Sequence, residues 1–215
     1  MKFLIQKVNR EVVHDFSFAL IQSIKFQNWM HQNDDIKYKF MNTGYLDGET
    51  YFNEFKPFHA KYIPIGTNEF VSLFLKQFYG KIPKPTNIPS ELLPYEFTKR
   101  FVFNGTEKEI EGEKFIKSND VIKGYTQIVN DHTDVPEGKY QISEVISIDS
   151  EWRAFVYKDK LVGLKHYCGE FTMYPLISPI NAMIKAYKNA PIAYTLDIGI
   201  NDQQGTFVIE CHDFF

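Results

Sequence analysis

The sequence predicts an α+β protein in which a small mixed N-terminal lobe precedes two lobes built from antiparallel sheets. Over residues 1–82, short apolar runs of strand length alternate with segments of helical periodicity. A proline-rich segment over residues 83–94 follows, and it is the best candidate for a domain linker. Beyond residue 95, strand-like runs and turns predominate. We therefore expect a lobe over residues 1–82, a linker over residues 83–94 and a strand-rich part over residues 95–215.

The N-terminal lobe is expected to contain three strands and two helices. The strands are expected at residues 2–6, 38–46 and 60–65. The first helix should bury one face with a four-residue repeat, formed by Val12, Phe16, Leu20 and Ile24. The second helix is expected to start at a Thr67 or Asn68 cap and to end at Gly80. Its buried face should hold Phe70, Phe74 and Phe78.

The remaining residues are expected to form strands, one helix and a closing hairpin. The strand candidates lie at residues 100–105, 113–118, 125–129, 140–148 and 151–169. The helix is expected over residues 178–190, and the hairpin over residues 194–215.

Composition excludes several classes of protein. With 44% hydrophobic residues and a net charge of −3, the chain can bury a core, and its overall charge would not recruit nucleic acid or a membrane surface. Two cysteines are too few for a disulfide framework, and neither a signal peptide nor a membrane span is predicted. We therefore expect a cytoplasmic protein. The sequence also lacks a Walker phosphate loop, a dinucleotide fingerprint, a nucleophile elbow, a kinase catalytic loop and cysteine pairs with zinc spacing.

The closing hairpin places carboxylates within two otherwise apolar strands. If Ile200 pairs with Phe207, Asp197 stands directly opposite Glu210. Alternation further predicts that Thr206, Val208, Glu210 and His212 share one face of their strand. Facing carboxylates repel unless a cation lies between them, and Mg²⁺ needs one or two protein carboxylates. Solvated acids on an edge hairpin are the alternative.

Two basic features accompany the hairpin. Lys117 lies in an apolar strand and Lys123 follows a turn, so the two could clamp a polyphosphate or be solvated edge residues. Arg153 lies between Trp152 and Ala154 in an apolar strand and needs an anionic partner. That partner is either a phosphate or a carboxylate, such as Glu151 or Glu144.

These segments occur in the order found in the ATP-grasp superfamily, and the sequence resembles a divergent, phage-associated clade marked by one arginine and two lysines. The resemblance rests on segments that cover most of the chain. They are "YIPIGTNEFV", "NIPSELLPYEFTKRFV", "FIKSNDVIKGYT", "SEVISIDSEWRAFV", "LVGLKHYCG" and the closing "YTLDIGI…TFVIECHDFF".

The resemblance implies an ATP-grasp fold, in which two α+β lobes, residues 95–143 and 144–215, enclose ATP. It also implies roles for individual residues. Lys117, Lys123 and Arg153 would contact the phosphates, with Lys165 as a further contact, and Arg153 would be catalytic. Glu144, Val145 and Ile146 would meet adenine through backbone groups. Asp197 and Glu210 would hold Mg²⁺.

Two features depart from the family pattern. Asparagine usually follows the metal-binding glutamate by two residues, but here this position is His212. Histidine is a poor ligand for Mg²⁺, so His212 would orient the site, bind substrate or favour another metal. The family's chain also typically continues beyond the position of Phe215 with a tail rich in glycine and small residues.

The resemblance implies an ATP-dependent ligase that activates a carboxylate as an acyl phosphate for attack by an amine or thiol. The acceptor could be a peptide or protein, and the clade would place the enzyme in the cytoplasm of a phage-infected host. The alternatives are a nucleotide-binding module without turnover and a structural protein that retains only the fold. The acid, the acceptor and the oligomeric state stay open.

Overall fold

The computed structural model describes residues 1–43, 61–80, 84–122, 124–132 and 134–213. The chain forms two compact units, Met1–Pro83 and Lys84–Phe215, and each unit is described by itself. The architecture is that of a mixed α+β protein with several sheets, as predicted.

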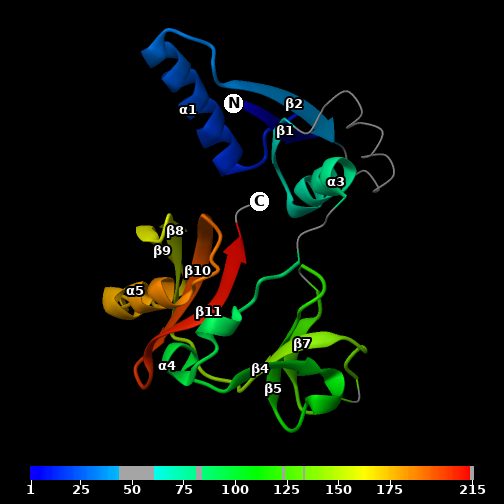
Figure 1. Ribbon diagram of the computed structural model, residues 1–215, viewed down its shortest axis with the longest axis vertical. Helices are drawn as coiled ribbons and strands as arrows, with labels where there is room; N and C mark the ends of the chain where they lie inside the picture. The colour runs from blue at the N-terminus through cyan, green and yellow to red at the C-terminus, as the bar shows by residue number, and fades with distance from the viewer. Residues whose placement is uncertain (44–60, 81–83, 123, 133, 214–215) are drawn as a thin grey trace. The chain divides into compact units, whose positions relative to one another are not determined.

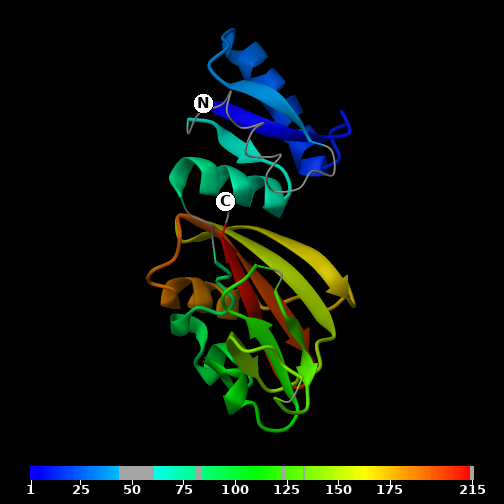
Figure 2. The same ribbon diagram turned by 90° about the vertical axis from the view of Figure 1, so that its right-hand side faces the viewer.

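The first unit is a parallel three-stranded sheet between two helices (Figure 1 and Figure 2). Its elements are β1 (Lys2–Val8), α1 (Asp15–His31), β2 (Lys37–Thr43), β3 (Ile63–Ile65) and α3 (Asn68–Tyr79). The strand order is β2-β1-β3, with both outer strands parallel to β1. Three strands and two helices were expected in this part of the chain, although the end of the second predicted strand, residues 44–46, lies outside the described residues.

The two helices of this unit differ in how well the sequence predicted them. Helix α3 begins where Thr67 Oγ1 accepts a hydrogen bond from the Phe70 backbone, and it ends at Gly80 with φ of 66°, as expected. The predicted buried face of α1 is wrong at its start, because Val12 precedes the helix and Phe16 is 54% exposed, whereas Ile24 is buried as predicted. The buried face instead follows Ser17, Ile21 and Ile24, which the helix start at Asp15 turns toward the sheet.

The second unit contains two antiparallel four-stranded sheets. Its elements are η1 (Ser90–Leu92), α4 (Tyr95–Thr98), β4 (Val102–Thr106), η2 (Glu107–Glu109), β5 (Lys114–Ser118), β6 (Thr126–Val129), β7 (Lys139–Ser143), β8 (Ser150–Tyr157), β9 (Lys160–Gly169), α5 (Ile177–Ala186), β10 (Ala193–Asn201) and β11 (Gly205–Asp213). The sheet orders are β4-β7-β5-β6 and β11-β10-β8-β9. The strand predicted over residues 140–148 ends earlier, at Ser143, so a non-strand segment joins the two sheets.

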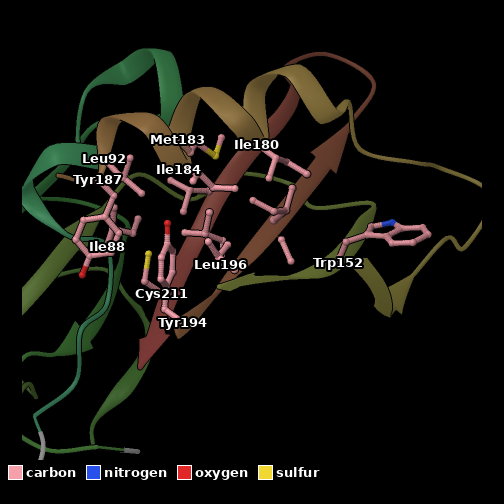
Figure 3. Packing of buried hydrophobic residues seen from close by; sticks show 14 of the residues in the cluster. Ile88, Leu92, Trp152, Ile180, Met183, Ile184, Tyr187, Tyr194, Leu196 and Cys211 are labelled. Atoms are coloured by element: carbon pink, nitrogen blue, oxygen red, sulfur yellow. The ribbon is translucent and has the colours of Figure 1, made fainter. Parts of the chain in front are cut away.

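Helix α5 covers one face of the sheet β11-β10-β8-β9 and creates the largest core of the unit (Figure 3). Leu196 and Ile198 from β10 pack against Ile180 and Met183 from the helix, and all four are fully buried. This packing leaves the opposite face of the sheet available for polar side chains. The smaller core of the other sheet contains Ile110, Ile116, Val135, Tyr140 and Ile142.

The segment predicted as a linker is integrated into the second unit. Ile88 and Leu92 are buried in the core beneath α5. The carbonyl of Asn87 accepts a hydrogen bond from the Cys211 backbone in β11, and the Asn87 side chain donates to the Ser118 carbonyl at the end of β5. Residues 87–92 therefore connect the strands that carry Glu210 and Lys117.

Gly199 in β10 leaves room for the Phe207 ring of the neighbouring strand β11. Gly199 stands opposite Phe207, and a Cβ at Gly199 would overlap the Phe207 ring, which is fully buried. We predict that Gly199→Ala lowers the free energy of unfolding by about 1–3 kcal/mol, because the ring has little room to move. The control is Gly163→Ala in β9, where the nearest atom to the added Cβ lies at 3.5 Å. Urea denaturation measures both, and equal stability of the two variants would contradict the prediction.

Candidate functional site

Four charged residues form a row across the sheet β11-β10-β8-β9. Arg153 pairs with Lys165 on one side and with Asp197 on the other, and Asp197 pairs with Glu210. Residues paired across strands project to the same face. The row therefore lies on the face opposite α5 and runs from two cations to two carboxylates.

Asp197 and Glu210 stand opposite each other because β11 contains a β-bulge. Ile198 pairs with Val208, whereas Asp197 pairs with Glu210, so Ile209 is the extra residue. The predicted pairing of Ile200 with Phe207 is wrong by one residue, since Ile200 pairs with Thr206. The bulge compensates for this shift, and the predicted opposition of Asp197 and Glu210 is confirmed.

The bulge also redistributes the side chains of β11 between the two faces. Val208 and Cys211 both pack in the core beneath α5, although an unbroken strand would turn them to opposite faces. The prediction that Thr206 and Val208 share a face with Glu210 and His212 is therefore wrong. Thr206 accepts a hydrogen bond from the Leu176 backbone, just before α5, and lies on the core side.

A buried arginine supports the chain at the bulge. Arg100 is 6% exposed, and its Nη1 donates to the carbonyls of Thr98 at 3.0 Å and Val208 at 3.1 Å. Burial lowers the pKa of Arg100 to about 10, so the guanidinium stays charged at neutral pH. Val208 is the residue before Ile209, so this contact anchors β11 next to Glu210.

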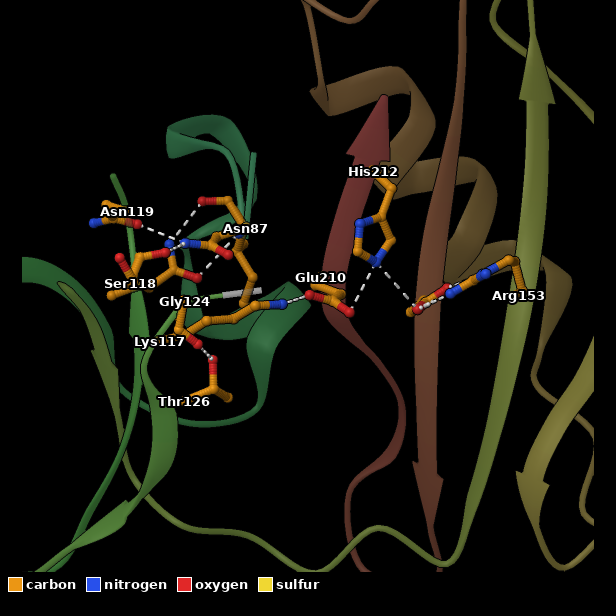
Figure 4. Close-up of polar contacts among 12 residues, drawn as sticks. Asn87, Lys117, Ser118, Asn119, Gly124, Thr126, Arg153, Glu210 and His212 are labelled. Atoms are coloured by element: carbon orange, nitrogen blue, oxygen red, sulfur yellow. Dashed lines mark hydrogen bonds and ion pairs between the residues drawn. The ribbon is translucent and has the colours of Figure 1, made fainter. Parts of the chain in front are cut away.

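Arg153 binds Asp197 through two parallel hydrogen bonds (Figure 4). Its Nε and Nη2 each lie 2.7 Å from one carboxylate oxygen. Burial disfavours the charge on Asp197, but the hydrogen bonds from Arg153 and His212 outweigh this effect and hold the pKa of Asp197 below its usual value. The carboxylate alternatives that the sequence offered for Arg153, Glu151 and Glu144, are therefore wrong.

Lys117 reaches the same group of residues from the other sheet. It forms an ion pair with Glu210 across the space between β5 and β11 (Figure 4). Burial lowers the pKa of Lys117, and the nearby charge of Asp197 partly opposes that shift. Each of the two carboxylates thus has its own cation.

His212 completes the group. Its Nε2 lies 2.8 Å from Glu210 Oε1 and 3.5 Å from Asp197 Oδ2. The donor atoms of Asp197, Glu210 and His212 all lie within 4.8 Å of one another. Atoms bound to one ion at about 2.1–2.2 Å can lie up to about 4.4 Å apart, so the spacing of these donor atoms is compatible with a shared metal ion.

The other residues predicted to contact the nucleotide do not all lie beside Asp197 and Glu210. Lys165 is exposed and stands next to Arg153 in the row. The Glu144 side chain accepts a hydrogen bond from the Phe101 backbone, whereas Val145 and Ile146 line a pocket of about 430 Å³ with the β10–β11 turn. Lys123 lies outside the described residues.

Two residues near Arg153 were not identified from the sequence as parts of the site. Glu151 is two residues away on the same strand, and burial, with the charge of Asp197, raises its pKa. The sequence offered Glu151 only as a partner for Arg153, a position that Asp197 takes instead. The Tyr167 ring lies 5.0 Å from the Arg153 guanidinium. Tyr167 follows Lys165 by two residues, and Lys165 pairs with Arg153, so alternation along β9 is compatible with this contact.

Comparison with protein families shows which family the chain belongs to. The family described as "ATP-grasp domain, R2K clade family 2" matches residues 97–215, more than half of the chain. The chain belongs to this ATP-grasp family. Membership supports an ATP-dependent ligase as the general class of activity, in agreement with the resemblance seen in the sequence.

Solved structures agree with this ATP-grasp assignment at the level of the fold. A RimK domain ATP-grasp protein from Sphaerobacter thermophilus matches with a TM-score of 0.56 and 13% identity, over 100% of this chain and 92% of its own. D-alanine–D-alanine ligase from Bacillus anthracis matches with a TM-score of 0.51 and 13% identity, over 99% of this chain and 86% of its own. No curated protein matches significantly. None of the described helices has the length and hydropathy needed to span a membrane.

The ion pairs change what we expect of Asp197. From the sequence, two unpaired carboxylates would repel each other in the absence of metal, so an amide at either position would not reduce stability. The premise of unpaired carboxylates is wrong, because Arg153 pairs with Asp197 and Lys117 pairs with Glu210.

We therefore predict that Asp197→Asn lowers the free energy of unfolding by about 2 kcal/mol without any ligand, because Arg153 loses a charged partner. The matched control is Asp202→Asn in the β10–β11 turn, an exposed position that should change stability by less than about 0.5 kcal/mol. Chemical denaturation in metal-free buffer measures both. An Asp197→Asn variant as stable as the wild type would show that repulsion between the carboxylates outweighs the Arg153 pair.

Proposed function

We propose that this protein is an ATP-dependent ligase that joins a carboxylate to an amine or thiol through an acyl phosphate. The observation that carries the proposal is the convergence of Arg153, Asp197, Glu210 and Lys117 from two sheets. Such a set provides cations for phosphate oxygens and carboxylates for a metal ion in one place. A peptide or protein is the proposed substrate class.

In the proposed complex, Lys117, Lys123 and Arg153 bind the phosphates of ATP, with Lys165 as a further contact. Glu144, Val145 and Ile146 provide backbone groups for adenine. The non-strand segment after β7 supports this assignment, because its backbone groups are not all used in a sheet. The pocket beside Val145 and Ile146 is consistent with access to that segment.

Asp197 and Glu210 are the proposed metal ligands, and the closeness of their oxygens to each other fits this role. A bound Mg²⁺ would neutralise charge on the phosphates during transfer. Arg153 would stabilise the negative charge that develops on the transferred phosphoryl group, since its forked guanidinium can contact two oxygens at once.

The reaction proposed has two steps. A carboxylate oxygen of the substrate attacks the γ-phosphorus, and ADP leaves with the electron pair of the broken P–O bond. The amine then attacks the acyl carbon, loses a proton to water and expels phosphate. The protein contributes alignment and charge neutralisation, the two terms that dominate phosphoryl transfer.

Nucleotide binding requires the ion pairs of the site to exchange partners. Arg153 and Lys117 are bound to the two carboxylates that would hold the metal. When metal and phosphate enter together, the carboxylates can turn to the metal and the cations to the phosphates. No charge is left unpaired, so the exchange avoids the cost of a bare charge in a partly buried site.

A nucleotide-binding module without turnover is the second candidate. His212 favours it, because a histidine beside the two carboxylates is a poor ligand for Mg²⁺. Titration calorimetry with ATP, with and without Mg²⁺, tests binding, and an ADP-release assay tests turnover. Binding without ADP release over a range of acids and amines would favour the module.

Lys117→Ala is predicted to weaken ATP binding by at least about tenfold, because a phosphate contact by a buried ammonium group is lost. The control is Lys114→Ala, which alters the same strand but removes a side chain that donates to the carbonyls of Glu111 and Glu113. Calorimetry measures both affinities. If the two variants bind ATP equally well, Lys117 is not a phosphate contact.

Arg153→Lys is predicted to reduce turnover by at least about a hundredfold while ATP affinity falls much less, because a point charge cannot replace the two-pronged contact in the transition state. ADP release and calorimetry measure the two effects separately. A parallel loss of stability and affinity, without a separate effect on turnover, would assign Arg153 to a structural pair with Asp197.

A further inference from the structure

The position of His212 indicates which metal the site selects. Its backbone pairs with Thr195 of β10, two residues from Asp197, in the part of β11 that follows the bulge. This register directs the imidazole toward both carboxylates (Figure 4). The atom that approaches them is Nε2, a nitrogen that can bind a metal ion.

The three donors combine one nitrogen with oxygens from two carboxylates. Mg²⁺ strongly prefers oxygen ligands and retains much of its water, so an imidazole adds little to its binding. First-row transition ions bind imidazole nitrogen more readily than Mg²⁺ does, and among them Mn²⁺ shares with Mg²⁺ the preference for carboxylates. The His212 side chain is 45% exposed, which leaves an open path for an ion and for water ligands.

We infer that His212 is a third protein ligand and that the site selects a first-row transition ion such as Mn²⁺ over Mg²⁺. This inference rests on the proposed function, because it concerns the metal of the same site. It adds the identity of the metal ion, which follows from a donor set of one imidazole nitrogen and two carboxylates.

The experiment measures Mn²⁺ binding by electron paramagnetic resonance in the presence of a non-hydrolysable ATP analogue, with Mg²⁺ as competitor. The variants are His212→Asn and His212→Gln, and the control is His132→Asn, which replaces an exposed histidine on the other sheet's side of the unit. The analogue also binds metal, but its contribution is common to all four proteins and cancels in the comparison. Melting temperatures establish that each variant is folded.

We expect displacement of half of the Mn²⁺ to require at least about tenfold more Mg²⁺ in the wild type and in His132→Asn than in either His212 variant. Spin-echo modulation from a directly bound ¹⁴N nucleus should appear in the wild type and disappear in both variants. His212→Gln separates ligation from hydrogen bonding, because glutamine can still donate to Glu210.

Each other outcome has a defined meaning. Mn²⁺ bound without nitrogen modulation, or a His212→Gln variant with wild-type selectivity, would overturn the inference and leave the proposed ligase function intact. Nitrogen modulation in a protein that releases no ADP would support the inference and count against the ligase. A wild type that binds no Mn²⁺ in the presence of the analogue would overturn the inference, whereas ADP release with Mg²⁺ tests the ligase function separately.

Discussion

The ion pair between Arg153 and Asp197 is the contact on which the rest of the site depends. It joins the two central strands of the sheet and fixes the orientation of both side chains through two hydrogen bonds of 2.7 Å. Because the guanidinium neutralises Asp197, a second carboxylate, Glu210, can stand directly opposite it. Lys117 neutralises that second group from the other sheet. The two ion pairs therefore offset the repulsion between the two carboxylates.

This arrangement requires a sheet with one apolar and one polar face. Helix α5 covers the apolar face, and its contacts with Leu196 and Ile198 fix the orientation of β10. Alternation along β10 then directs Asp197 to the other face. On β11, unbroken alternation would turn Val208 and Glu210 to the same face. The extra residue Ile209 lets Val208 face the core while Glu210 stands opposite Asp197. Packing on one side of the sheet thus decides where charge appears on the other side.

The two sheets of the second unit are also held together by contacts outside the charged group. Asn87 bonds to both β11 and the end of β5, and Arg100 donates to the Val208 carbonyl beside the bulge. Asn87 lies in residues 83–94, whose prolines suggested only a linker, and Arg100 follows that segment. A polar side chain that is buried must find partners, and here the partners belong to the strands that carry Lys117 and Glu210. The segment therefore connects the two strands that carry Lys117 and Glu210.

The sequence by itself determined the fold class, the family, and the face of β10 that carries Asp197, because hydrophobic periodicity and motif order are local properties of the chain. It also predicted that Asp197 and Glu210 oppose each other, although through a register that is one residue out. Only the tertiary structure decided the bulge at Ile209 and the partners of the charged groups. These depend on contacts between residues far apart in the chain: Arg153 with Asp197, and Lys117 with Glu210. An arginine in an apolar strand reveals that it needs an anion, but only packing decides which carboxylate lies within reach.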